Sequence, residues 1–123
     1  MSVSGECKEL RWVGSSKKDL LDMPAKVMDT FGFALYLAQR GGKHVQSKPL
    51  QGFGGAGVLE VVEDHAGDTF RAIYTVKVGR FVYVLHCFQK KSKRGGQTPM
   101  QDLSLIRARL KSAQAHAAGV GND

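Results

Sequence analysis

The stretch FRAIYTVKVGRFVYVLHCFQKKSKR, residues 70–94, decides the fold of this chain. Its first part, residues 70–77, alternates in a period of two, which predicts a strand. Its second part, residues 81–89, is apolar at nearly every position, as is typical of a central strand covered on both faces. Gly79 between them predicts a tight turn, because glycine adopts positive φ at little cost.

The alternation places two sets of side chains on opposite faces of the first strand. One face carries Phe70, Ala72, Tyr74 and Val76, and the other carries Arg71, Ile73, Thr75 and Lys77. The second strand leads into a cluster of cations that begins at Lys90. The hairpin is therefore expected to hold positive charge in a fixed place.

Length and composition predict one domain spanning residues 1–123, long enough to close a core without a metal or a disulfide framework. The two cysteines, Cys7 and Cys87, are expected to be reduced thiols. No apolar run approaches the ~20 residues of a membrane helix, and the N-terminus lacks an apolar signal core. We therefore expect a cytoplasmic protein with no membrane partner.

The net charge of +7 and the pI near 9.7 favour an anionic partner, either nucleic acid or an acidic protein. The charge is concentrated near the C-terminal end, where Asp102 is the lone acidic residue between residues 90 and 111. The basic residues of that segment are Lys90, Lys91, Lys93, Arg94, Arg107, Arg109 and Lys111.

Working outward from the hairpin, the remaining segments predict a small α+β fold in the order β-α-α-β-β-β-α. We expect strands over 9–13 and 58–63, a short helix capped at Ser15 or Ser16, and a longer helix over 24–40 that ends at a glycine pair. A last helix begins at 98–101, with Leu103, Ile106 and Leu110 as its apolar side and Arg107 elsewhere around it. The sheet is expected to be antiparallel, with the first strand at an edge or beside the last strand. Two helices would cover one face, the third would lie near the open end, and residues 1–8 and 113–123 would be loose tails.

The segment GKHVQSKPLQGFGGAG, residues 42–57, is expected to be a polar connection. Its glycines match G-x-G-x-x-G, but a dinucleotide site requires a strand before the motif and a helix after it. Here a loop precedes and a strand pattern follows, so we reject that function. Lys43, His44 and Lys48 make the loop a candidate flank of an anion site.

No familiar catalytic set or metal-ligand spacing is present. His86 and Cys87 are adjacent and would point to opposite faces of a strand, so they do not form half of a zinc site. Glu60, Glu63 and Asp64 can be imagined as an acid/base pair, but exposed strand and turn carboxylates explain them equally well. We expect neither a metal nor a cofactor.

Arginine and lysine residues remain as the candidate chemistry. Arg71 lies on the polar face of a central strand, where a guanidinium requires a partner or a cleft. Antiparallel pairing would bring it close to residues 88–90. Such cations can bind a phosphate and support cleavage of RNA by its own 2′-hydroxyl, which needs no metal but needs a base of lowered pKa. A solvated basic face is the alternative.

Residues 48–110 resemble the phage-derived, HigB-like branch of the RelE/ParE toxin superfamily, and the resemblance extends over about residues 10–110. The most specific pieces are GFGGAGVLE, DTFRAIYTV, YVLHCFQKKSKRG and the Thr-Pro at the start of the last helix. The resemblance implies the toxin of a type II toxin–antitoxin system. Such a toxin is an mRNA interferase, a ribosome-dependent endoribonuclease that inhibits translation. A cognate helix-turn-helix antitoxin neutralises it.

The resemblance also implies roles for individual residues. Arg71, Lys90 and Lys91 correspond to catalytic positions, with Arg71 stabilising the phosphorane and either lysine acting as base. RNA-binding roles fall to Lys48, Tyr74, His86, Lys93 and Arg94, and Tyr74 and His86 are reserve proton acceptors.

Two other functions remain open. ParE-like relatives inhibit DNA gyrase without enzymatic activity, and a plain RNA-binding domain would be harmless to the cell. The QKKSKR cluster, residues 89–94, favours RNA over gyrase. We expect weak cleavage of naked RNA, because a few cations lack pockets that read bases and would depend on the ribosome for positioning.

Overall fold

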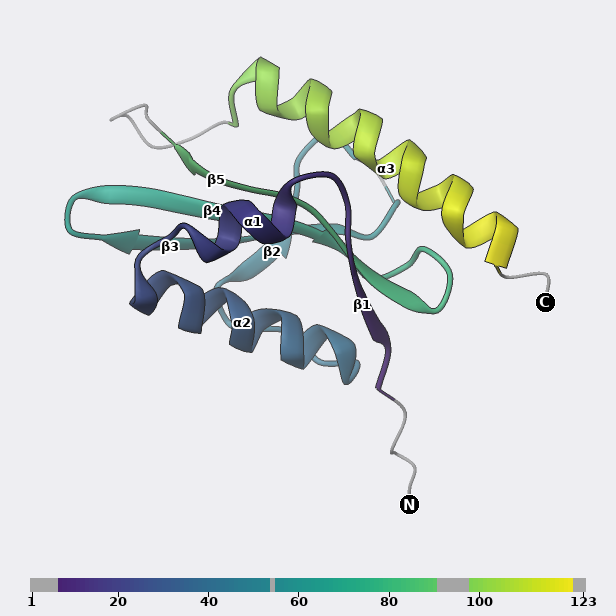
Figure 1. The fold of residues 1–123 in the computed structure, drawn as a ribbon, viewed down its shortest axis with the longest axis horizontal. Helices are drawn as coiled ribbons and strands as arrows, with labels where there is room; N and C mark the ends of the chain where they lie inside the picture. The colour runs from purple at the N-terminus through teal and green to yellow at the C-terminus, as the bar shows by residue number, and fades with distance from the viewer. Residues whose placement is uncertain (1–6, 54, 91–97, 121–123) are drawn as a thin grey trace.

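The computed structural model describes residues 7–53, 55–90 and 98–120. Within them the chain forms a five-stranded sheet with helices on both faces (Figure 1), which confirms the α+β class. In chain order the elements are β1 (Glu9–Trp12), α1 (Ser16–Leu21), α2 (Ala25–Gln39), β2 (Ser47–Pro49), β3 (Val58–His65), β4 (Asp68–Thr75), β5 (Phe81–Lys90) and α3 (Met100–Val120).

The strands lie in the order β1-β5-β4-β3-β2. β1 is at an edge beside β5, which confirms its expected place, but the two strands are parallel, so the expectation of a purely antiparallel sheet is wrong. The strand β2 at the opposite edge was missed. It spans three residues inside the polar connection, and its proline is tolerated because it lies at an edge of the sheet.

Two tight turns set the register of the central strands. β3 and β4 are joined through Ala66 (φ 53°) and Gly67 (φ 87°), two successive residues with positive φ, as in the turns that favour two-residue hairpins. Gly79, between β4 and β5, has φ 59°, which confirms the turn predicted there. The resulting register places Arg71 opposite Phe88.

Two apolar cores flank the sheet. Phe70, Ala72 and Tyr74 face α1 and α2, as the alternation predicts. The opposite face packs against α3 through Ile106 and Leu110, which contact a cluster that includes Ile73. α3 therefore packs on this face of the sheet, chiefly against β5 (Figure 1), and the expectation that it would lie near the open end is wrong, because Ile73 gives the face of Arg71 an apolar surface to bury.

The helix ends agree with the expected ones in part. Of the two serines expected as caps of α1, Ser15 holds the cap position, whereas Ser16 is the first residue of the helix and is buried, with its Oγ donating to the Val84 carbonyl at 3.1 Å. α3 continues to Val120, so the expectation of a loose tail from residue 113 is wrong. Ala113 is one of the buried residues of this helix, and its burial favours continuation of the helix past residue 113. α2 agrees with the expected helix within one residue at each end.

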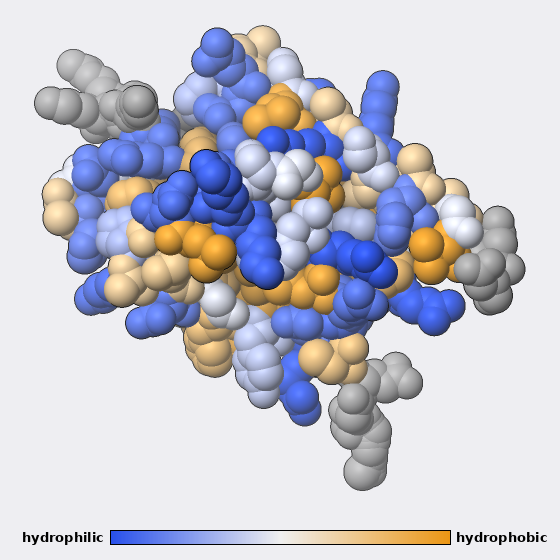
Figure 2. All heavy atoms as spheres, viewed as in Figure 1, coloured by the Kyte–Doolittle hydropathy of each residue, from blue (hydrophilic) through white to orange (hydrophobic). Residues whose placement is uncertain are grey.

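The surface seen in Figure 2 is mainly hydrophilic, with small apolar patches between charged side chains. Across the described ranges, no helix combines the length and the apolarity that crossing a bilayer would require.

Candidate functional site: a basic pocket between the sheet and α3

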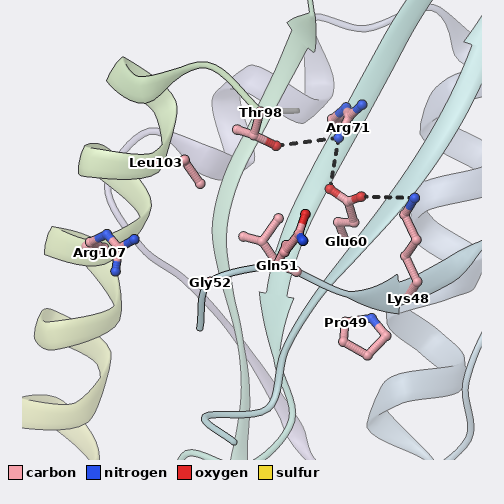
Figure 3. A pocket seen from close by; sticks show the side chains of 10 residues that line it. Lys48, Pro49, Gln51, Gly52, Glu60, Arg71, Thr98, Leu103 and Arg107 are labelled. Atoms are coloured by element: carbon pink, nitrogen blue, oxygen red, sulfur yellow. Dashed lines mark hydrogen bonds and ion pairs between the residues drawn. The ribbon is translucent and has the colours of Figure 1, made fainter. Parts of the chain in front are cut away.

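A pocket of about 720 Å³ opens between the sheet and α3 (Figure 3). Strands β2, β3 and β4 form one wall, α3 forms the facing wall, and the connection after β2 closes one end. The lining residues are Lys48, Pro49, Leu50, Gln51, Gly52, Glu60, Arg71, Thr98, Leu103 and Arg107. Most of these residues come from segments far apart in the sequence.

Arg71 is held in this pocket by a buried ion pair. Its Nη1 donates to Glu60 Oε2 at 2.9 Å and to Thr98 Oγ1 at 3.4 Å, and the side chains of Arg71 and Glu60 are 7% and 5% exposed. Glu60 faces Ile73 in the register, so it lies diagonal to Arg71 on the same face. Of the two explanations that the sequence left open for Glu60, an exposed strand carboxylate is therefore wrong.

Lys48 extends the ion pair toward solvent. It lies opposite Glu60 on β2, and its Nζ is 3.6 Å from Glu60 Oε1. Its side chain is 67% exposed, so it can contact an anion that enters the pocket. Arg107 reaches the same pocket from α3, with its guanidinium carbon 4.8 Å from the centroid of the Phe53 ring. Three cations and one carboxylate thus line the pocket, and only Lys48 and Arg71 pair with the carboxylate, so the excess of positive charge favours an anionic ligand.

Lys90 lies beside the pocket, on the same face of the sheet as Arg71, because Thr69 is its partner and alternate residues share a face. Burial is the largest cause of a lowered pKa of Lys90, and the positive charge of Arg71 lowers the pKa further. The negative charge of Glu60 partly opposes this shift. Among the described residues no acceptor lies within hydrogen-bonding distance of its Nζ. These surroundings favour the neutral amine, which can accept a proton.

The structure does not bring every candidate residue to the pocket. Tyr74 is fully buried on the opposite face, where its hydroxyl donates to Ser47 Oγ at 2.7 Å. His86 Nε2 lies 2.7 Å from Asp102 Oδ1, and the imidazole stacks on Phe88 at 4.5 Å outside the lining of the pocket. Lys91, Lys93 and Arg94 lie outside the described residues.

Glu60, Thr98 and Arg107 are the pocket residues that sequence reasoning did not select. One signal for Glu60 was available, since it occupies the alternating position on β3 that shares a face with Arg71. A signal for Arg107 was also available: it follows Leu103 by one helical turn, so the two side chains lie on the same side of α3. Neither signal specifies how α3 lies on the sheet.

Fold and site together define a small α+β protein with a pocket lined by three basic residues. The chain belongs to the phage derived protein Gp49-like family (DUF891), whose family pattern matches residues 18–111. This family is related to toxin–antitoxin systems, which implies an antitoxin partner in general. No curated protein and no solved structure matches the chain.

Proposed function

We propose that this chain is the toxin of a type II toxin–antitoxin system, of the HigB-like branch of the RelE/ParE superfamily. In this proposal it acts in the cytoplasm and cleaves translated mRNA on the ribosome, and a cognate helix-turn-helix antitoxin neutralises it. The observation that carries the proposal is the convergence of Lys48, Arg71 and Arg107 on one pocket, next to a lysine of lowered pKa.

The chemistry begins with the neutral Lys90 amine, which takes the proton of an RNA 2′-hydroxyl. The 2′-oxygen attacks the adjacent phosphorus, the bond to the 5′-oxygen breaks, and that oxygen takes a proton from water. The products are a 2′,3′-cyclic phosphate and a 5′-hydroxyl. No step requires a metal or a cofactor.

Arg71 stabilises the additional negative charge that develops on the phosphorane. Its guanidinium is already held by Glu60 and Thr98, so little reorganisation is needed at the moment of reaction. Exposed Lys48 binds the phosphate backbone at the mouth of the pocket, and Lys91, Lys93 and Arg94 extend this contact in the proposal. Tyr74 and His86 have no direct role, because they do not line the pocket.

Primer extension on a reporter mRNA in a translating extract tests this function. The wild-type protein should produce cuts inside the translated frame, and these should vanish when ribosomes are absent. Arg71→Ala should abolish the cuts. Lys48→Ala should reduce them without unfolding the protein, because Lys48 is largely exposed.

Arg80→Ala is the matched control. Arg80 is an exposed arginine on the turn between β4 and β5 and does not line the pocket, so this variant should cut like the wild type. An uncut message in the complete extract would overturn the proposed nuclease. The next assay would then be DNA supercoiling by gyrase, which tests the ParE-like alternative.

A further inference from the structure

The pocket has two chemically different ends. Lys48, Glu60 and Arg71 make one end ionic, and their chemistry suits a phosphate. The other end is formed by Leu50 and Leu103, together with further lining residues from the β2–β3 connection and α3. Aliphatic walls contribute nothing to phosphate binding, so the second end fits a different part of an RNA ligand.

Arg107 is the polar group of that second end. Its guanidinium carbon lies 4.8 Å from the centroid of the Phe53 ring, and Phe53 is 9% exposed, so a cation–π contact with a buried ring helps to hold the guanidinium in place. In the described ranges the structure records no hydrogen bond or ion pair of Arg107 with another side chain. Arg107 is also exposed on α3, so its N–H groups are available to a ligand.

We propose that this end of the pocket is a subsite for a guanine base, read by Arg107. The proposal rests on the proposed function in one respect, namely that the ligand is RNA. Single-stranded RNA is commonly recognised by bases that stack on flat or apolar side chains and form hydrogen bonds through their edges. Leu50 and Leu103 supply the apolar contact, and Arg107 supplies the N–H donors.

Guanine is the base that these N–H donors fit. Arginine has only donors, and guanine presents two neighbouring acceptors, O6 and N7, which match its fork. Adenine and cytosine place an amino donor on the corresponding edge, where it would oppose the guanidinium. Gln51, the exposed amide nearby, can donate or accept and therefore does not discriminate among the bases.

One nucleotide can occupy both ends of the pocket together. The volume of about 720 Å³ lies in the range of sites that enclose a small ligand. Figure 3 shows Arg107 and Leu103 on α3, across the pocket from the ion pairs of Glu60 with Arg71 and Lys48. A phosphate bound at the ionic end would therefore belong to a nucleotide whose guanine lies against α3.

Binding of 2′-O-methyl RNA trinucleotides that differ only in the central base tests the subsite. The methyl group blocks attack by the 2′-oxygen, so binding is measured without cleavage. NMR titration at one fixed salt concentration should show the guanine trinucleotide binding about tenfold more tightly than the adenine one, as one bidentate contact provides. Arg107→Ala should remove this difference.

Two further variants separate base reading from charge. Arg107→Lys keeps the positive charge but not the fork, so it should lose the guanine preference while retaining most of the salt-dependent affinity. Lys111→Ala removes an exposed cation one turn further along α3 and should keep the preference. Equal affinity for all four bases, or a guanine preference that survives in Arg107→Ala, would overturn the subsite.

The two proposals can fail separately. A guanine preference in the binding assay with no cuts in the translating extract would refute the nuclease and support the subsite. Cuts in the extract with no base preference in the binding assay would refute the subsite and leave the nuclease standing.

Discussion

The buried pair of Arg71 and Glu60 allows a quantitative test of how the proposed catalytic arginine is held. We consider Arg71→Ala, Glu60→Ala and the double variant. With 2.9 Å between Nη1 and Oε2 and an effective dielectric constant of about 20, the attraction is about 6 kcal/mol. Desolvation of each ion costs several kcal/mol and offsets most of this attraction. The net contribution of the pair to stability is therefore small.

Removing one partner is nevertheless costly, because the other charge stays buried. Glu60 would keep Lys48 at 3.6 Å in Arg71→Ala, so we expect a loss of about 3 kcal/mol in the free energy of unfolding. Glu60→Ala leaves the guanidinium with Thr98 at 3.4 Å and other weaker contacts, so we expect about 4 kcal/mol. The double variant should lose about 2–3 kcal/mol less than the sum of the two single losses.

Urea unfolding of the four proteins, followed by circular dichroism, measures this coupling. Arg80→Ala serves as the reference for loss of an exposed arginine and should change the free energy of unfolding by less than about 0.5 kcal/mol. Additive losses, with a coupling energy near zero, would refute the reasoning. They would mean that Glu60 does not hold Arg71 in solution and that the guanidinium is not preorganised for a phosphorane.

Two further predictions concern stability. Because the pKa of Lys90 is lowered in the folded protein, its charged form opposes folding, and this cost disappears as pH rises from the folded pKa toward the ordinary value near 10.5. Lys90→Met should therefore raise the free energy of unfolding at pH 7 and lose this advantage near pH 10, and a gain independent of pH in urea titrations would rule out the buried charge as its cause. Gly57 has φ 74°, and a Cβ there would lie 2.6 Å from the Lys77 side chain, so Gly57→Ala should cost about 1–3 kcal/mol. Gly32 lies in α2 with open space around it, so Gly32→Ala should gain about 0.5–1 kcal/mol, and the opposite order of thermal midpoints would be incompatible with these conformations.

Most of the central architecture could be read from local patterns. Alternation over residues 70–77 separates the two faces of β4, and the continuous apolar run of β5 indicates a strand with a core on each side. These signals are reliable because successive side chains of a strand point to opposite faces. The order of apolar and polar residues therefore indicates which face is buried. The position of Arg71 opposite Phe88 follows from the same hairpin.

The candidate site could be predicted only in part. Sequence reasoning selected Arg71 and Lys90 from strands that clear patterns indicate, and it selected Lys48 from a polar connection in which the strand β2 was missed. It also selected Tyr74, which the alternation itself places on the face of Phe70, away from Arg71. It left Glu60 as either an acid/base residue or an exposed carboxylate, because burial of a charge depends on a partner that the local pattern does not show.

The sequence by itself determined the α+β class, the central hairpin, the excess of positive charge and the strand that carries Arg71. Only the tertiary structure decided that β1 lies parallel to β5, that the short β2 brings Lys48 opposite Glu60, and that α3 brings Arg107 to the same pocket. The physical reason is the range of the interactions. Faces and turns follow from neighbours along the chain, whereas the pocket depends on how distant elements bury their apolar sides against one another.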